Sequence, residues 1–135
     1  MERISWDQSF SVGVAELDKQ HKEIVKTINL LISSFDAQAR SEAISEALTR
    51  LTKYAAEHFE TEERLLADHG YPELSSQKGD HKEYRKKVVA FCADAMSGKP
   101  SISKELLQFL RDWWVDHILK KDMKYRSFFT ERGVK

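Results

Sequence analysis

Apolar positions recur at steps of three and four residues along four segments of the chain, a spacing that predicts amphipathic α-helices. The first helix is expected to begin near Asp18, a good N-cap residue, and the second near Ser41. Gly70, followed by Tyr71-Pro72, predicts the end of the second helix, and the run Ser-Gly-Lys-Pro at 97–100 predicts the end of the third. The predicted helices therefore span residues 18–35, 41–70, 74–95 and 101–117.

Helices of this length joined by short linkers imply antiparallel neighbours, so we predict an all-α fold, an up-down antiparallel four-helix bundle. The first 17 residues lack the helical pattern. We expect residues 1–17 to form an extended N-terminal arm, with Trp6, Phe10, Val12 and Val14 packed along the bundle. No repeat or low-complexity stretch divides the chain, which predicts a single domain over residues 1–135.

Composition and charge exclude several classes of partner. Lys plus Arg (22) balance Asp plus Glu (22), so no net field favours nucleic acid or an anionic membrane. No apolar run approaches the ~20 residues that span a bilayer, and residues 1–6 lack the apolar core of a signal peptide. We therefore expect a cytoplasmic protein with no nucleic-acid or membrane partner. The single cysteine, Cys92, precludes an internal disulfide and is expected to be buried and inert.

Histidines and acids on the predicted buried faces are the most informative feature of the sequence. His58 and Glu62 stand four residues apart and point inward from one helix, while His21, His81 and His117 lie on the inward faces of the other three. Burying such groups costs several kcal/mol unless they are paired or bound to metal. A lone histidine on an apolar face is usually a satisfied core residue. Because four of the five histidines follow this pattern, we favour a common metal site.

Two further polar residues are harder to assign. His69 lies just before Gly70 and off the main stripe, so we interpret it as a surface residue favoured by the helix dipole. Asp122 follows His117 by five residues, about 140° round an ideal helix. It shares the site only if the helix is locally overwound or unwound, or if its side chain reaches round. The other interpretation is a solvated residue within the run Lys-Lys-Asp at 120–122.

The types of ligand narrow the choice of metal. Imidazoles and carboxylates without a thiolate suit iron, zinc, manganese or copper. Two acids with several histidines suit a pair of metals bridged by the acids. The Glu-x-x-His pairs of ferritin-like di-iron bundles are absent, the nearest match being Asp18-x-x-His21. Phe59 follows His58, so the H-E-x-x-H motif of zinc proteases is absent as well.

Three segments together resemble the hemerythrin family in its bacterial single-domain form. The segment from Trp6 through Phe10-Ser-Val-Gly-Val14 to Leu17-Asp-Lys-Gln-His21 resembles the family's arm and first ligand. His58-Phe-Glu-Thr-Glu62-Glu63 resembles its H-F-x-x-E-E segment, and Phe109-Leu-Arg-Asp-Trp113-Trp-Val-Asp-His117-Ile, ending at Asp122, resembles its final segment. The resemblance covers essentially the whole chain and includes the five-residue step to Asp122.

The resemblance implies two iron ions joined by an oxo or hydroxo bridge, with O2 bound reversibly at one of them. The implied ligands are His21 and His58 on the iron with the open position, His81 and His117 on the other iron, and Glu62 and Asp122 as bridges. The protein would then fix the coordination and keep the pocket dry and apolar.

One departure from the family's pattern falls on a ligand position. The family usually has H-x-x-x-H on the third helix, where this chain reads Gln77-Lys-Gly-Asp-His81. Gln77 stands where the third histidine of the second iron is expected. Either its weaker amide oxygen binds iron, or it only hydrogen-bonds nearby, and one iron then keeps a labile position. Gly79 costs about 1 kcal/mol in a helix interior relative to Ala, so this turn is expected to be soft.

A second departure concerns the ligand pocket. Trp114 stands where the family commonly has a smaller apolar residue, and it either narrows the O2 pocket or packs outward. Trp113 is expected to be an ordinary core residue. These departures leave three alternatives to simple O2 binding, storage or delivery: an O2, NO or redox sensor, a di-iron enzyme acting on peroxide or NO, and a purely structural metal bundle.

Overall fold

The computed structural model describes residues 2–37, 41–96 and 104–135, and the side chains of 41–44 and 91–96 lie outside this description. Its backbone is helical nearly throughout, and no strand occurs among the described residues. The elements are η1 (Gln8–Phe10), α1 (Ala15–Asp36), α2 (Ser41–Asp68), α3 (Leu74–Met96), α4 (Lys104–Asp116), η2 (His117–Asp122) and α5 (Met123–Glu131). The side chain of Cys92 and the predicted helix start at Ser101 fall outside the described residues.

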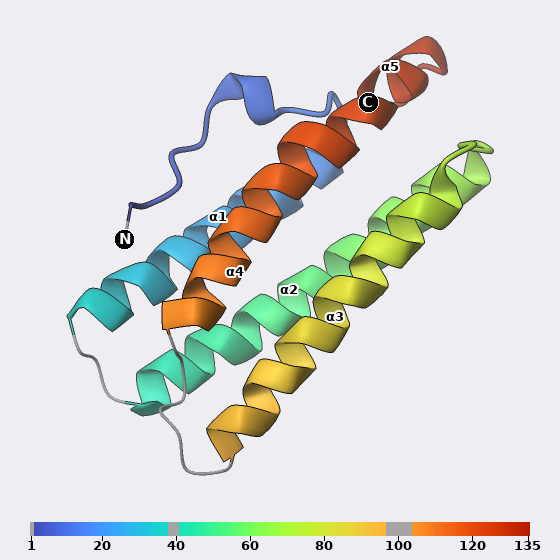
Figure 1. The fold of residues 1–135 in the computed structure, drawn as a ribbon. Helices are drawn as coiled ribbons and strands as arrows, with labels where there is room; N and C mark the ends of the chain where they lie inside the picture. Colours follow the sequence, from blue (N-terminus) through green and yellow to red (C-terminus); the bar gives the residue numbers. More distant parts are fainter. Residues whose placement is uncertain (1, 38–40, 97–103) are drawn as a thin grey trace.

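Helices α1, α2 and α3 and the continuous segment α4–η2–α5 form the four rods of the predicted up-down bundle (Figure 1). α1 packs against α2 and α4, and α3 packs against α2 and α4, so the four rods enclose one core. The fourth rod is composite, because α4, η2 and α5 follow one another without a break. None of the described helices is both long enough and apolar enough to cross a membrane. Helix packing of this kind buries one apolar stripe from each rod.

The N-terminal arm is shorter than predicted. α1 begins at Ala15, three residues before Asp18, so residues 15–17 are helical. Asp18 does not cap the helix; its carboxylate accepts hydrogen bonds from the Ser11 hydroxyl (2.6 Å) and the Val12 amide (2.9 Å), which ties the arm to the first turn. The arm also contains a 3₁₀ turn, η1, capped by the side chain of Asp7. Val12 is fully buried, as the prediction required.

The end of α2 matches the prediction. Gly70 adopts a φ of 70°, which is open to glycine at little cost. The backbone amide of Tyr71 donates a hydrogen bond to the carbonyl oxygen of Leu66 (2.9 Å), and the amide of Gly70 donates one to the carbonyl oxygen of Ala67 (3.1 Å). These two bonds form a Schellman motif, which satisfies carbonyl groups left free at a helix end. The motif places Tyr71 beside Leu66 in one apolar cluster.

The core consists of two apolar clusters with a polar band between them. Along α1, Leu17 belongs to the cluster near α5, and Ile24 belongs to the larger cluster in the body of the bundle. Along α2, Phe59 belongs to the larger cluster, and Leu66 belongs to the cluster near α5. Two of the predicted ligands lie between these positions, His21 between Leu17 and Ile24 and Glu62 between Phe59 and Leu66. The fold therefore seals a polar site on both sides with apolar packing.

Candidate metal centre

Six polar side chains from all four rods converge in the polar band. All are buried: five have no exposed surface, and His117 is 4% exposed. α1 provides one, α2 two, α3 one, and the composite fourth rod two. They are the six residues that the sequence singled out: His21, His58, Glu62, His81, His117 and Asp122. Buried imidazoles and carboxylates at this density need a common partner or extensive mutual pairing.

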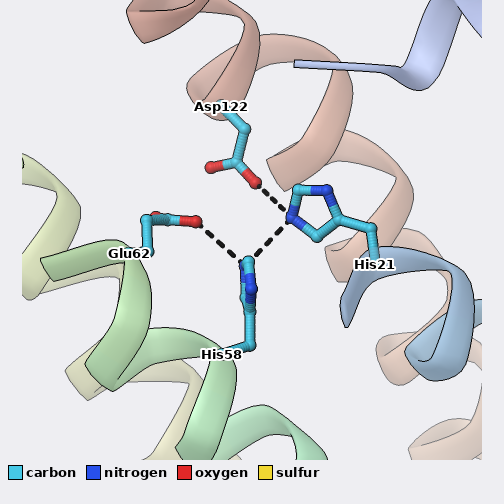
Figure 2. A group of neighbouring side chains, drawn as sticks. All are labelled: His21, His58, Glu62 and Asp122. Carbon is cyan, nitrogen blue, oxygen red and sulfur yellow. Dashed lines mark hydrogen bonds and ion pairs between the residues drawn. The ribbon is translucent and has the colours of Figure 1, made fainter. Parts of the chain in front are cut away.

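One half of the cluster contains His21, His58, Glu62 and Asp122 (Figure 2). The Nε2 atoms of His21 and His58 are 2.9 Å apart. His21 Nε2 lies 3.0 Å from Asp122 Oδ2, and His58 Nε2 lies 2.9 Å from Glu62 Oε2. The four side chains therefore point their donor atoms at one another across the centre of the bundle.

The other half contains Glu62, His81 and His117. The Nε2 atoms of the two histidines are 3.3 Å apart, and His81 Nε2 lies 3.1 Å from Glu62 Oε1. His117 Nε2 lies 3.0 Å from Asp122 Oδ1 and 3.7 Å from Glu62 Oε1. Glu62 and Asp122 thus each direct one oxygen to the first histidine pair and the other oxygen to the second pair.

A π-helical turn explains how Asp122 reaches the cluster. Residues His117–Asp122 form η2, in which hydrogen bonds close five residues apart instead of four. Five residues make about one π-turn, so both ends of η2 face the same way. The helix is locally unwound, which is one of the possibilities that the five-residue step left open. The solvated interpretation of Asp122 is wrong, because its side chain is fully buried.

The donor atoms fit metal binding. Two ligands about 2.1 Å from one metal and at right angles to each other stand about 3.0 Å apart. The contacts between neighbouring Nε2 and carboxylate atoms, from 2.9 to 3.3 Å, cluster around this value. Asp122 Oδ2 is buried, and among the described residues its one polar neighbour within ion-pair distance is His21 Nε2 at 3.0 Å, which is itself a candidate ligand. A cation would satisfy that atom and would remove the repulsion between the two carboxylates.

Two neighbouring side chains orient the imidazoles from outside. The Nδ1 atom of His58 is 2.9 Å from the Gln20 amide oxygen, and the Nδ1 atom of His81 is 3.0 Å from Glu63 Oε2. An acceptor at Nδ1 places the proton there and leaves the Nε2 lone pair free for a metal. Neither Gln20 nor Glu63 was assigned a role from the sequence, although each is adjacent to a predicted ligand in the chain.

Tyr125 is a further site residue that the sequence analysis missed. Its side chain is fully buried, and its hydroxyl donates to Glu62 Oε2 at 3.1 Å. Burial, together with the charges of Asp122 and Glu62, raises the pKa of Tyr125 well above its ordinary value, so the hydroxyl keeps its proton and remains a donor. Tyr125 stands three residues after Asp122, one helical turn on, and this spacing is the signal that could have found it.

In the metal-free cluster, the electrostatic environment favours the ionised form of the carboxyl groups of Glu62 and Asp122. Burial alone would raise the pKa of the Glu62 carboxyl, but the charge of His58 and hydrogen bonds from the histidines hold it well below its usual range. Burial would also lower the pKa of His117, yet the charges of Asp122 and Glu62 outweigh it and raise that pKa to about 10. Burial and the neighbouring His21 lower the pKa of His58. The cluster therefore presents anionic oxygens to any cation that enters.

Gln77 is 2% exposed and lies at the edge of the second half. Its Nε2 is 3.3 Å from the carbonyl oxygen of Lys121 and 3.4 Å from Asp122 Oδ1. Within the described part of the chain, its Oε1 atom is buried and has no hydrogen-bond partner. Gly79 causes no interruption, because α3 continues through it.

Aromatic rings surround the imidazoles. Trp114 is fully buried, with its ring centroid 5.9 Å from that of His58, and its Nε1 donates to the Tyr84 hydroxyl at 3.1 Å. The interpretation that Trp114 packs outward is therefore wrong. Trp113 packs against the core, as expected, but it is half-buried and also stacks on His117 at 4.4 Å and 12°. Phe59 stacks in a similar way on His81, at 3.9 Å and 14°.

His69 lies apart from the cluster, as predicted, but it is half-buried and not fully on the surface. Its Nδ1 is 2.8 Å from the Leu65 carbonyl oxygen, near the end of α2. Its ring meets Phe129 edge-on at 5.8 Å. His69 therefore helps to close the end of the helix and contributes nothing to the candidate metal centre.

Comparison with known proteins agrees with this geometry. The family model described as "Hemerythrin HHE cation binding domain" matches residues 12–128. The chain belongs to the hemerythrin family. This hemerythrin-family chain is 35% identical over 123 residues to the "Hemerythrin-like protein" of Naegleria gruberi, with 91% of both chains covered. It is 32% identical over 130 residues to the "Bacteriohemerythrin" of Methylococcus capsulatus, which covers 93% of this chain and 95% of the relative.

A solved structure of wild-type hemerythrin has the same fold as this hemerythrin-family chain. The TM-score is 0.84 at 27% sequence identity, with 92% of this chain and 95% of the other covered. The "Myohemerythrin" of Theromyzon tessulatum is 31% identical over 127 residues, covering 93% of each chain. Hemerythrins bind iron, and the buried cluster of this chain is a possible set of iron ligands.

Proposed function

We propose that this chain holds two iron ions, bridged by Glu62 and Asp122 together with an oxo or hydroxo group, and that it binds O2 or another small diatomic ligand. The observation that carries the proposal is the division of each carboxylate between the two histidine pairs. Carboxylates placed in this way suit two metals side by side better than one. The reducing power of the iron pair, when bound, would support reversible binding of a diatomic ligand.

The chain's own residues have distinct tasks in this proposal. His21 and His58 hold the first iron, and His81 and His117 hold the second. Both pairs are buried, so bulk water is kept from the centre. The buried ring of Trp114 lies beside His58, with the ring centroids 5.9 Å apart, and would narrow the space open to a ligand of the first iron.

A second candidate function is sensing of O2 or NO, or reaction with peroxide or NO. The specific observation that favours it is Gln77, which contributes an amide where a further imidazole would hold the second iron more firmly. Weaker coordination makes an iron more open to exchange of ligands. A short-lived O2 adduct that converts at once to the oxidised protein would support this function over storage or delivery.

The proposal is tested by metal analysis and optical spectroscopy on one anaerobically reconstituted sample. We expect about two irons per chain, and a new visible band when O2 meets the reduced protein. The control is His69→Gln, which removes the histidine outside the cluster and should change neither result. Iron at background level in the reconstituted wild type would contradict the proposal. Stoichiometric zinc with no iron would favour a structural metal bundle.

A further inference from the structure

Gln77 faces the second half of the centre with the nitrogen side of its amide. Its Nε2 lies near two oxygen atoms that can only accept hydrogen bonds, the carbonyl of Lys121 at 3.3 Å and the carboxylate of Asp122 at 3.4 Å. An amide NH₂ carries hydrogens on this side and has no lone pair available for a metal. In this orientation Gln77 supports Asp122 by hydrogen bonding and is not a ligand.

The reverse orientation of the amide is unfavourable for a local reason. Exchanging the two amide atoms would place Oε1 against the Lys121 carbonyl and the Asp122 carboxylate, an arrangement of three acceptors without a donor. Nε2 would then occupy the buried position in which, within the described residues, Oε1 finds no partner. The reversed amide would then have neither of its polar atoms satisfied, whereas the observed orientation leaves only Oε1 without a partner. The two acceptors therefore hold the amide with its nitrogen toward the centre.

The protein ligands that remain are the same for both metals. Each half has two imidazole nitrogens, and Glu62 and Asp122 each direct one oxygen to each half. If the first metal keeps a position free for an external ligand, the second metal keeps one as well. The place for such a ligand is beside Gln77, at the edge of the half formed by His81 and His117.

A small pocket on the protein surface adjoins the outer side of Gln77. Tyr71, Glu73, Ser76, Gln77, Lys121 and Lys124 line it. Its volume of about 10 Å³ is close to the space that one water molecule needs. Two lysines and one glutamate give the lining an excess of positive charge, although Lys121 Nζ also lies 3.3 Å from Asp80. Lys124, which also lines the pocket, lies outside this ion pair, and its positive charge favours the approach of small anions.

We propose that the second metal position carries its own external ligand site, adjoining Gln77 and reached from this pocket, and that the site takes a small inorganic anion. This inference rests on the proposed function, because it needs both metals in place. It makes the centre one with two ligand positions, one at each iron.

Azide is the probe, since it is a small anion whose binding to ferric iron can be counted by optical titration and by calorimetry. Iron is first quantified on each sample, and circular dichroism checks that each variant is folded. We expect the oxidised wild type and Gln77→Ala to bind two azides per chain. Gln77→His, which offers an imidazole nitrogen at the same place, should bind one.

The outcomes separate this inference from the proposed function. Two irons with one azide in the wild type would overturn the inference alone, and a rise to two in Gln77→Ala would identify Gln77 as a ligand. Two azides in Gln77→His, at full iron content, would show that the second site lies elsewhere. Fewer than two irons in the wild type would overturn both.

The proposed route is tested with lysine variants. Lys124→Ala removes a charge from the pocket and is expected to slow association of one of the two azides about twofold at low salt, with the other unchanged. Lys120→Ala is the matched control, because Lys120 is on the preceding turn, is highly exposed and does not line the pocket. Equal effects of the two variants would contradict entry through this pocket.

Discussion

Replacing Glu63 by glutamine should weaken one metal position and leave the other almost unchanged. Glu63 Oε2 lies 3.0 Å from the Nδ1 atom of His81, a ring with no exposed surface. The carboxylate fixes the proton at Nδ1 and increases the electron density that Nε2 offers to a metal. Glutamine has the same reach and keeps an acceptor oxygen, but it lacks the charge. Alanine removes both the charge and the acceptor.

The size of the effect follows from the type of bond. Loss of an outer partner of a metal-bound histidine typically lowers metal affinity by about 10–100-fold, which corresponds to about 1.4–2.8 kcal/mol. The Glu63 side chain is 22% exposed, so solvent screens part of its charge. Since a hydrogen bond to a charged group is roughly twice as strong as a neutral one, we expect about 10-fold for Glu63→Gln and nearer 100-fold for Glu63→Ala.

The assay is the release of iron to a chelator, followed over time. The wild type should lose its two irons at similar rates, whereas Glu63→Ala should lose one of them much faster. Gln20→Ala is the complementary variant, because Gln20 supports His58 in the other half. Glu60→Gln is a control on an exposed face of the same helix. Release from Glu63→Ala that matches the wild type in both phases would refute this role of Glu63.

Three further changes test the packing, the hydrogen bonds and the charge of the centre. Trp114→Leu leaves a cavity and removes the hydrogen bond from Nε1 to the Tyr84 hydroxyl, so the free energy of unfolding of the metal-free protein should fall by about 2–4 kcal/mol in a denaturant titration. A loss below about 1 kcal/mol would show that the site is loosely packed. Tyr125→Phe removes the donor to the Glu62 carboxylate and should cost about 1.5–3 kcal/mol in the same titration, and an unchanged stability would count against that bond. In the metal-free protein the pKa of His117 is raised to about 10, from about 6.5 in the unfolded chain. The protonated ring therefore contributes its full stabilisation below about pH 6.5, and this contribution is lost as the pH rises toward 10. Stability should therefore decline as the pH rises from about 7 toward 10, and a slope equally steep in His117→Gln would assign the effect to another group.

Periodicity was sufficient to predict those parts of the fold whose boundaries are set by local chemistry. The end of α2 depends on Gly70 and the bonds around it, and all of these lie within a few residues. The start of α1 was predicted too late for a tertiary reason. Asp18 has the side chain of a helix cap, but its carboxylate is used by Ser11 and Val12 of the arm. Propensity alone does not reveal such a choice between partners.

Five of the six residues that converge in the candidate centre were predictable because each is a polar residue on an apolar face. Asp122 lies off that face in an ideal α-helix, and only the resemblance, with its five-residue step from His117, assigned it to the site. The position of Tyr125 one turn after Asp122 places it near the centre, but its bond to Glu62 was not predictable, because that contact joins residues on different helices. The stacking of Trp113 on His117 depends on side-chain rotation within one helix, which spacing does not fix. Which amide atom of Gln77 faces the centre depends on the carbonyl of Lys121, and this carbonyl belongs to another helix.

The π-turn gives the fourth rod one residue more than its inward face requires. Counted from His117, the inward residues Asp122, Tyr125 and Phe129 stand 5, 8 and 12 positions further along the chain. Subtracting one from each gives 4, 7 and 11, the steps of a single α-helical face. Deleting an exposed residue within the turn, such as Leu119, would let an unbroken α-helix carry the same face. The aspartate of the centre is thus placed by an insertion in the backbone, and the helix beyond it stays in register because the whole surplus is absorbed in one turn.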